Sequence, residues 1–484
     1  MGSTTARPNP FAATGGGSVR WHGAEHDTSA EPVAPGPGRA VLNRLDLRGV
    51  TDPADLAARL PRPVDEADRP IDAVRAILAE VRDRGDSALF ELTQRFDGVV
   101  LDTLRVDPAE IAAALAATSA EVVAALELAR DRIAAFHRDQ MRPEVVHDDG
   151  GVRVRSYSRP VAATGCYVPG GRAAYPSTVL MTAVPARVAG VDRVVVCVPP
   201  DRATGAVATV TLAAAAVAGV DEVYAIGGAQ AIAAMAFGTD TIAPVDVICG
   251  PGNMYVALAK QEVAGTVGIA AAFAGPSEVV VIADATVAPE LAAIDVMLQA
   301  EHGPDGLAWL VTWDESAADA VVDAIARLTE AAPRRAEITA TLARSGHCVL
   351  VDSPEAAIAV SDAVAPEHLE LLCDGAEALA STVANAGAIF CGPWSPASIG
   401  DYVAGPSHVL PTHGSARFSS ALTVDDFCRQ HHVITVSPAG FGAVGPAAQV
   451  IAEAEGLDAH AESVRLRRAM LDAGAQPEPG AGAR

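Results

Sequence analysis

The chain of 484 residues lacks the features that mark several common classes of protein. Its net charge is −25 and its Lys and Arg residues form no cluster, which argues against a nucleic-acid partner because a phosphate-binding face needs concentrated positive charge. No uninterrupted apolar stretch reaches membrane-spanning length, and the first residues show no export signal. Aromatic residues are scarce, at 4%. We expect a cytoplasmic protein with no nucleic-acid or membrane partner, whose cores are filled mainly by Ala, Val and Leu.

Paired cysteines are also absent. The seven cysteines are scattered, no two form a Cys-x-x-Cys pair, and most stand in apolar runs such as 194–197. An odd number at wide spacing is typical of small buried side chains in a reducing compartment. We therefore expect reduced thiols.

The chain does contain an alternation of short apolar strands and helices. Periodicity predicts helices over 71–90, 108–141, 177–189, 206–218, 289–302 and 316–329, and strands over 193–199, 222–226, 278–282, 308–312, 348–351 and 388–391. Such alternation builds right-handed βαβ units and parallel sheets. We predict an α/β fold with two Rossmann-like, incomplete doubly wound domains, and a ligand between them at the carboxyl ends of strands.

Two short runs carry the first candidates for chemistry. Gln299 and His302 are three residues apart at the end of a predicted helix, so an amide oxygen and an imidazole on one face could chelate a cation. The alternative is a His that is stabilised by the helix dipole. Glu367 and His368 form an adjacent acid and base after Pro366, which a turn could expose; the alternative is a polar loop.

Two later segments add further polar groups. The Gly- and Pro-rich loop 400–411 holds Asp401 and His408, which could be catalytic on a rigid scaffold or could simply satisfy turn backbone. The segment 455–460, which contains His460, is by itself typical of a solvated helix start. Each of these signals is weak when it is taken singly.

The order of the motifs is more informative than any one of them. The chain has no His-x-x-x-His, Walker or G-x-G-x-x-G pattern. It does have runs at Gly165 to Gly171, Gly227 to Ile232, Gly250 to Asn253, Ala274 to Val279, Gln299 to Pro304, Pro366 to Leu369, Gly400 to Thr412 and Glu455 to His460. In order and approximate separation these runs resemble the histidinol dehydrogenase family, over about Val41 to Asp472.

This resemblance implies a zinc enzyme that oxidises L-histidinol to L-histidine through L-histidinaldehyde, in two NAD-linked steps that end histidine biosynthesis. The zinc ligands of each subunit would be Gln299, His302, Asp401 and His460, although N and O donors also suit Co²⁺ or Mn²⁺. In the family His368 matches the base that accepts the hydroxyl proton, and Glu367 matches the residue that activates water for attack on the aldehyde.

The resemblance also implies binding positions. The substrate-binding positions are matched by Ser277, Gln299, His302, His368, Asp401, His408, Glu455 and His460. The cofactor-binding positions are matched by Tyr167, Gln230 and Asn253. In the family the last His comes from the other subunit, so His460 would complete the site of a second copy in a homodimer.

A division into domains follows from the same resemblance. We expect a disordered extension over 1–40, an N-terminal dimerisation segment over 41–66, a discontinuous α/β domain with the metal and catalytic residues over 67–165 and 277–421, a Rossmann-like NAD-binding domain over 166–276, a C-terminal dimerisation segment over 422–473 and a disordered tail over 474–484.

Two alternative functions stay open, and one departure from the family stands out. Where the family often has Ile-Asp before Ala274, this chain has 270–273 without an acidic residue. One alternative is a related zinc and NAD dehydrogenase that acts on another small alcohol. His408 and Glu455 argue against it, because they match positions that contact histidinol in the family. The other is a zinc metallohydrolase with Glu367 as base, which the matched cofactor positions disfavour. The presence of both Glu367 and His368 disfavours a non-catalytic metal-binding protein.

Overall fold

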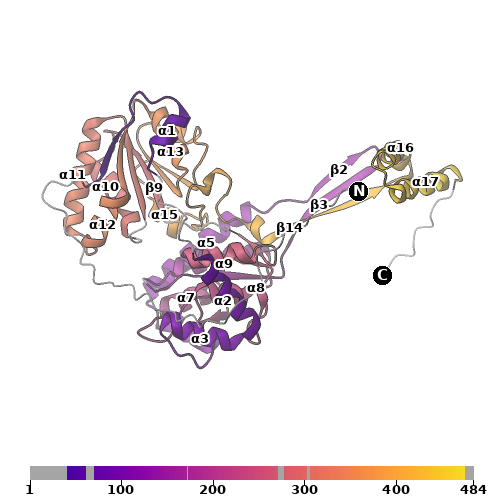
Figure 1. The fold of residues 1–484 in the computed structure, drawn as a ribbon, viewed down its shortest axis with the longest axis horizontal. Coiled ribbons are helices and arrows are strands. Elements are labelled where there is room, and N and C mark those ends of the chain that lie inside the picture. The colour runs from indigo at the N-terminus through magenta and orange to yellow at the C-terminus, as the bar shows by residue number, and fades with distance from the viewer. Residues whose placement is uncertain (1–40, 62–69, 172, 271–276, 302–305, 475–484) are drawn as a thin grey trace, which may run out of the picture. The chain divides into compact units, whose positions relative to one another are not determined.

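The computed structural model describes residues 41–61, 70–171, 173–270, 277–301 and 306–474. Three sheets and the helices around them make up these ranges (Figure 1). The predicted extension over 1–40, the tail after 474, the ligand candidate His302 and the stretch 271–276 lie outside the described residues.

The largest sheet has six parallel strands in the order β1-β11-β10-β9-β12-β13. Its strands are β1 (Asn43–Asp46), β9 (Glu278–Ala283), β10 (Leu307–Thr312), β11 (Gly346–Leu350), β12 (His368–Leu372) and β13 (Ala388–Cys391). One face packs against α10 (Pro289–Leu298), α11 (Glu315–Ala331) and α12 (Arg335–Ser345), and the other against α1 (Pro53–Arg59) and α13 (Pro354–Val364) (Figure 1). Shorter helices in this part of the chain are α14 (Ala376–Ala380), α15 (Ala397–Tyr402) and the 3₁₀ turns η2 (Gln299–Glu301) and η3 (Ser415–Arg417).

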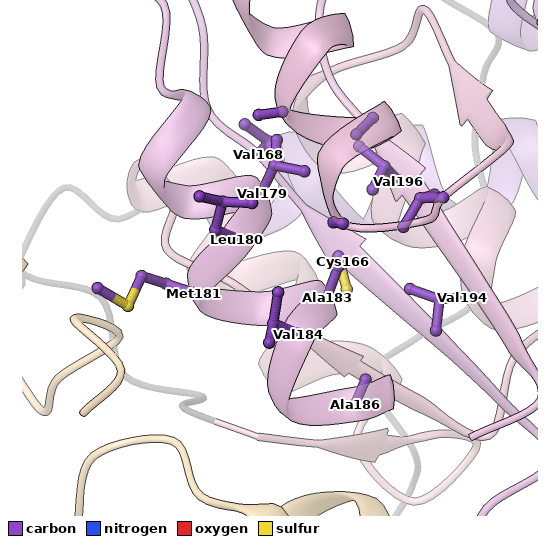
Figure 2. Close-up of a cluster of buried hydrophobic side chains, with 14 of the residues drawn as sticks. Cys166, Val168, Val179, Leu180, Met181, Ala183, Val184, Ala186, Val194 and Val196 are labelled. Carbon is purple, nitrogen blue, oxygen red and sulfur yellow. The ribbon is translucent and has the colours of Figure 1, made fainter. Parts of the chain in front are cut away.

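The second sheet has five parallel strands in the order β6-β5-β4-β7-β8. Its strands are β4 (Ala163–Tyr167), β5 (Arg193–Cys197), β6 (Glu222–Tyr224), β7 (Val247–Cys249) and β8 (Gly268–Ile269), and its connecting helices are α6 (Pro176–Ala189), α7 (Thr209–Val217), α8 (Gly228–Phe237) and α9 (Met254–Val263). Figure 2 shows small side chains of α6, such as Val179 and Ala183, in one buried cluster with Cys166 and Val196 of the strands. Buried Val and Ala fill this core, and both parallel sheets confirm the predicted α/β class.

Two long predicted helices are each broken into a pair. The stretch 71–90 forms α2 (Ile71–Arg84) and α3 (Asp86–Asp97), because Gly85 takes a φ of +56° that ends the first helix. The stretch 108–141 forms α4 (Pro108–Ala117) and α5 (Ala120–Asp139), because the Ser119 side chain accepts from the backbone of Val122 and starts a new helix. No single helix in the described ranges is long and apolar enough to cross a membrane, and α4 with α5 passes that test only as a pair bent by 114°.

The third sheet is antiparallel and mostly exposed. Its order is β14-β3-β2, with β2 (Val145–Asp149), β3 (Val152–Pro160) and β14 (Cys428–Val436). The turn η4 (Val424–Phe427) precedes β14, and α16 (Pro438–Ala454) and α17 (Asp458–Asp472) follow it. The backbone of Ser437 donates to the carbonyl of Gly151 at 2.8 Å, so the start of α16 is held by the β2–β3 turn.

The packing differs from the predicted domain boundaries at three points. Helices α2 to α5 pack mainly with the five-stranded sheet, and from the segment 277–421 the loop 403–409 also contacts α5. Strand β1, from the predicted dimerisation segment 41–66, pairs with β11 in the six-stranded sheet. Strand β3 pairs with β14 on one side and with β2 on the other, so 145–160 lies with the C-terminal segment. The reason is pairing between distant parts of the chain, which local periodicity does not encode.

Candidate active site

The candidate catalytic residues gather at the amino ends of β9 and β12. These strands are direct neighbours, with His368 opposite Val279 in the ladder. Glu367 precedes β12, His368 is its first residue, and Ser277 precedes β9. The carboxyl ends, where the sequence analysis placed the ligand, lie at the opposite edge of this sheet, so that expectation is wrong for these residues. The cause is that Gln299 and Asp401 lie on segments that have already returned to the amino edge.

His368 is the centre of this group. Its Nδ1 lies 3.1 Å from Gln299 Nε2 and 3.7 Å from Glu367 Oε2, and its Nε2 lies 3.3 Å from Asp401 Oδ1. The ring is 4% exposed and stacks on Phe390, with ring centroids 6.0 Å apart. The structure thus brings together four residues that the sequence analysis selected from three separate motifs.

Glu367 is buried and not exposed on a turn as predicted. It is 8% exposed, its Oε2 accepts from the backbone N–H of Glu278 at 3.1 Å, and Ser277 also bonds to it. The exposed turn is wrong because Pro366 leads directly into a strand of the buried sheet. Burial raises the pKa of Glu367, while His368 and the hydrogen bonds lower it. Burial next to Glu367 also raises the pKa of Glu278 to about 8.

The surrounding carboxylates control the charge of His368. Burial lowers the pKa of His368, but Glu367 and Asp401 raise it to about 9 overall. A ring protonated on both nitrogens must donate from Nδ1, which requires the amide oxygen of Gln299 to face it. A neutral ring that donates from Nε2 to Asp401 accepts the Gln299 N–H instead, as the amide is placed here. A cation bound by Asp401 would compensate that carboxylate and favour the neutral ring.

Asp401 and His408 come from one segment and contact each other. The predicted loop starts as the short helix α15, which places Asp401 one turn after Ala397, so the loop assignment is wrong for 400–402. His408 Nδ1 donates to the backbone carbonyl of Asp401 at 3.0 Å, and its Nε2 lies 3.1 Å from Thr178 Oγ1 on α6. Because Nδ1 carries the proton, the neutral His408 has its lone pair on Nε2.

Two of the four predicted metal ligands lie in this group. The amide oxygen of Gln299 is buried and has no hydrogen-bond partner among the described residues, so its lone pairs could serve a ligand. Gln299 lies in the turn η2 directly after α10, so the helix ends one residue before it. His302 lies outside the described ranges. His460 is exposed on α17, and the described residues contain no group of three His, Cys, Asp or Glu side chains arranged for a metal.

The predicted cofactor residues lie at the carboxyl ends of the five-stranded sheet. Tyr167 ends β4, Gln230 lies in the first turn of α8 after β6, and Asn253 caps α9 after β7. The Tyr167 hydroxyl accepts from the backbone N–H of Gly228 at 3.1 Å, and burial raises the pKa of Tyr167 to about 12. The strand order reverses between β4 and β7, and doubly wound sheets bind ligands at this point.

Other polar residues in this region had no predicted role. Glu278, Asp295 and Glu370 are buried carboxyl groups, and Thr178 contacts His408. The signal that could have found Glu370 is a charged residue inside the apolar strand 369–372, where an unpaired charge is costly. Ser277 is partly exposed beside Glu367, whereas Glu455, the residue that caps α16, is exposed and has no contact with the described residues of the site.

Comparison with known proteins identifies relatives over most of the chain. The family model described as histidinol dehydrogenase matches residues 60–468. The chain is 52% identical to the histidinol dehydrogenase of Parasynechococcus marenigrum over 81% of its length and 90% of that protein, and 50% identical to that of Cereibacter sphaeroides over 89% and 99%. The crystal structure of histidinol dehydrogenase from Elizabethkingia anophelis superimposes with a TM-score of 0.85 at 36% identity, over 90% of this chain and 99% of that one.

Proposed function

This chain belongs to the histidinol dehydrogenase family, whose members catalyse the final steps of histidine biosynthesis, and on that premise we propose that it oxidises L-histidinol to L-histidine with zinc and NAD. The observation that carries the proposal is the group around His368, where a buried acid and base adjoin two candidate metal ligands. The family match supports dehydrogenase chemistry and histidinol as the small-molecule substrate.

The proposed metal ligands are Gln299, His302, Asp401 and His460. The unpartnered amide oxygen of Gln299 and the carboxylate of Asp401, on either side of His368, supply two oxygen donors. Oxygen donors with two imidazoles and no thiolate suit zinc, and also Co²⁺ or Mn²⁺. A zinc ion at such a site would orient the substrate through its imidazole and amine nitrogens.

His368 and Glu367 would divide the proton transfers. His368 in its neutral form would accept the hydroxyl proton of the substrate, while a bound nicotinamide would supply the hydride acceptor. Glu367, with its carboxylate held by the backbone of Glu278, deprotonates the water that attacks the aldehyde. Burial raises the pKa of Glu367, which favours proton transfer from water, and a cation bound by Asp401 would offset the carboxylates that raise the pKa of His368 and so favour its neutral form.

NAD would bind at the carboxyl edge of the five-stranded sheet. The β4–β7 reversal and the α8 N-terminus support this placement, because backbone N–H groups at a helix start attract phosphate. The buried amide oxygen of Gln230 has no partner among the described residues, so it is available to a cofactor. Tyr167 and Asn253 lie at the strand ends on either side of the reversal.

A homodimer would supply His460 to the site of the other subunit, with Glu455 close to it in sequence. Exposed apolar side chains on the C-terminal segment support association: Ile434, Val450, Ile451 and Leu466 are each more than half exposed. A monomer would leave these side chains in water, whereas an interface would bury them.

The test is NADH formation by the purified, zinc-loaded protein with L-histidinol, and with a simple diol as the competing alcohol. We expect two NADH per histidinol consumed and no turnover of the diol, since four electrons leave the substrate. Turnover of the diol alone would favour the enzyme for another alcohol. Absence of NAD binding in a fluorescence titration would favour the metallohydrolase.

A further inference from the structure

Two buried carboxyl groups next to the candidate site have no role in the proposed mechanism. Asp295 on α10 is 6% exposed and Glu370 on β12 is 0% exposed. Their carboxyl groups adjoin each other, and Glu370 Oε2 is buried with no group among the described residues that donates to it. Two carboxylates have no proton to share, so one of the two must be protonated. Burial, with the adjacent Asp295, raises the pKa of Glu370 to about 9, so Glu370 carries this proton at neutral pH.

Glu370 also holds the start of the helix that carries Asp401. Its Oε1 accepts from the backbone N–H of Ala397, the first residue of α15, at 2.9 Å. The N-cap residue of α15 is Pro396, whose side chain cannot accept a hydrogen bond from the helix backbone. The helix is also packed tightly, because a Cβ on Gly400 would lie 2.5 Å from the Phe390 ring. Glu370 thus fixes α15 where a first-turn N–H would otherwise stay unpaired.

Each residue of this second group lies one helical turn, or two strand positions, from a residue of the candidate site on the same segment. Asp295 lies in the last turn of α10, and Gln299, the residue that caps this helix, follows four residues later, about one helical turn away. His368 and Glu370 are two residues apart on β12, which places both side chains on the same face of the sheet. Ala397 and Asp401 are again one turn apart on α15.

Three elements therefore each contribute one residue to two adjacent layers. The site layer is the hydrogen-bonded row Gln299, His368 and Asp401. The support layer is the row Asp295, Glu370 and the Ala397 backbone. Movement of one element in the support layer must move its residue in the site layer, because each pair is fixed by the regular backbone between them.

We propose that Asp295 and Glu370 are positioning residues, whose shared proton and bond to α15 hold the segments that carry the proposed metal ligands and base at their catalytic spacing. The proposal rests on the function proposed for the site layer. The pair acts through other residues and does not touch the substrate. A neutral donor at position 370 is sufficient for this role, since it keeps both hydrogen bonds.

The test compares Glu370→Ala with Glu370→Gln in the zinc-loaded full-length protein. Glu370→Ala removes the contacts with Asp295 and with the Ala397 backbone. We expect kcat with L-histidinol to fall by about 10- to 100-fold and KM to change by less than about threefold. A loss of activity of this size is typical when a residue that orients a metal ligand is removed. Glu370→Gln still donates to Asp295 and accepts from Ala397, so kcat should stay within about threefold of wild type. Ser361→Ala, on α13 at the opposite face of the sheet, is the matched buried control and should be unchanged.

Hydrogen exchange of the α15 amides gives a readout that does not depend on activity. Exchange should accelerate in Glu370→Ala and stay at the wild-type rate in Glu370→Gln and Ser361→Ala. Wild-type kcat in Glu370→Ala, an equal loss in both Glu370 variants, or unchanged exchange would overturn the proposal. If the wild-type protein does not oxidise histidinol, the proposed function fails. The hydrogen-exchange rates alone then decide whether Asp295 and Glu370 position α15. If Glu370→Ala does not fold, Asp295→Ala against Asp295→Asn makes the same comparison.

Discussion

At the scale of single residues, burial decides which carboxyl groups of the site are charged. Glu278 is 3% exposed and lies beside Glu367, and burial and that neighbour raise the pKa of Glu278 to about 8 from its ordinary value of 4.5. The folded protein therefore keeps a proton on Glu278 that the unfolded chain releases. Between these two values the folded state binds more protons, so stability falls as pH rises.

The variant Glu278→Gln should remove this part of the pH dependence. Each unit of pKa difference corresponds to about 1.4 kcal/mol, so the free energy of unfolding of wild type should fall by more than that of the variant between about pH 5 and about pH 8. Urea unfolding at both pH values measures the two slopes. Parallel slopes for the two proteins would contradict the protonated state of Glu278.

A second prediction concerns the division between Glu367 and His368. Glu367→Gln keeps the size of the side chain but cannot accept a proton, so it should slow the oxidation of L-histidinaldehyde by about 100-fold or more and the oxidation of L-histidinol much less. Single-turnover NADH formation with each substrate separates the two steps. Equal losses in both steps would contradict the role of Glu367 in activating water.

Sequence patterns identified the residues of the site better than their surroundings. Gln299, Glu367, His368 and Asp401 were all selected, and the structure brings them into contact. Their burial was not predicted, because the exposure of a Glu-His pair depends on which strands flank it. Glu370 was not selected for the same reason: its neighbours Asp295 and Ala397 lie on other elements.

At the scale of secondary structure, the close approach of two strand ends shapes the proposed cofactor edge. Gly250 follows β7 with a φ of +103°, and a Cβ there would lie 2.0 Å from the backbone carbonyl oxygen of Tyr167. Any side chain at this position must therefore push the ends of β4 and β7 apart. Those ends border the reversal of strand order where we place the nicotinamide cofactor.

Gly250→Ala should weaken NAD binding through this displacement. We expect KM for NAD to rise by about tenfold or more, because a displacement of about 1 Å in a binding site is costly. Gly265→Ala is the matched control, since Gly265 also has a left-handed φ of +97° but no atom within 4 Å of the added Cβ. Steady-state kinetics with varied NAD measures both; a similar rise in the control would assign the effect to backbone strain alone.

Element types were more predictable than element limits. The apolar strands 278–282 and 308–312 were predicted within a residue or two of β9 and β10, because continuous apolar runs mark buried parallel strands. The helix 71–90 was predicted as one element because its apolar spacing continues across Gly85. A positive φ at that residue is a property of packing and gives no periodic signal.

At the scale of the whole molecule, two residues that the family resemblance assigns to the site lie away from it. His460 and Glu455 are exposed on the C-terminal segment, with no contact to the group around His368. On the same segment Ile434 is 66% exposed and Val450 is 64% exposed. A monomer gains no stability from apolar side chains that stay in water. A symmetric dimer in which each C-terminal segment completes the site of the other copy accounts for both facts. That assembly and a cytoplasmic location stay predictions.

Mixing two inactive variants tests this exchange directly. In the proposed dimer one subunit supplies His368 to a site and the other supplies His460. His368→Asn removes the base and His460→Ala removes the ligand from the other subunit, so each homodimer should be inactive. Zinc should be retained in the first variant and lost in the second. In a mixed dimer one site has both changes and the other has neither. Random reassociation should therefore restore about a quarter of wild-type activity.

The control for this experiment pairs two changes that lie in the same body. His368 and Gln299 belong to the same subunit's part of the site. In a mixture of His368→Asn with Gln299→Ala every site therefore lacks one of these two residues, so no activity should return whichever chains associate. Recovery in the first mixture and none in the second would assign His460 to the site of the other copy. No recovery in either, with dimers present by light scattering, would place His460 in the site of its own chain, since a site formed within one chain gains nothing from exchange of partners.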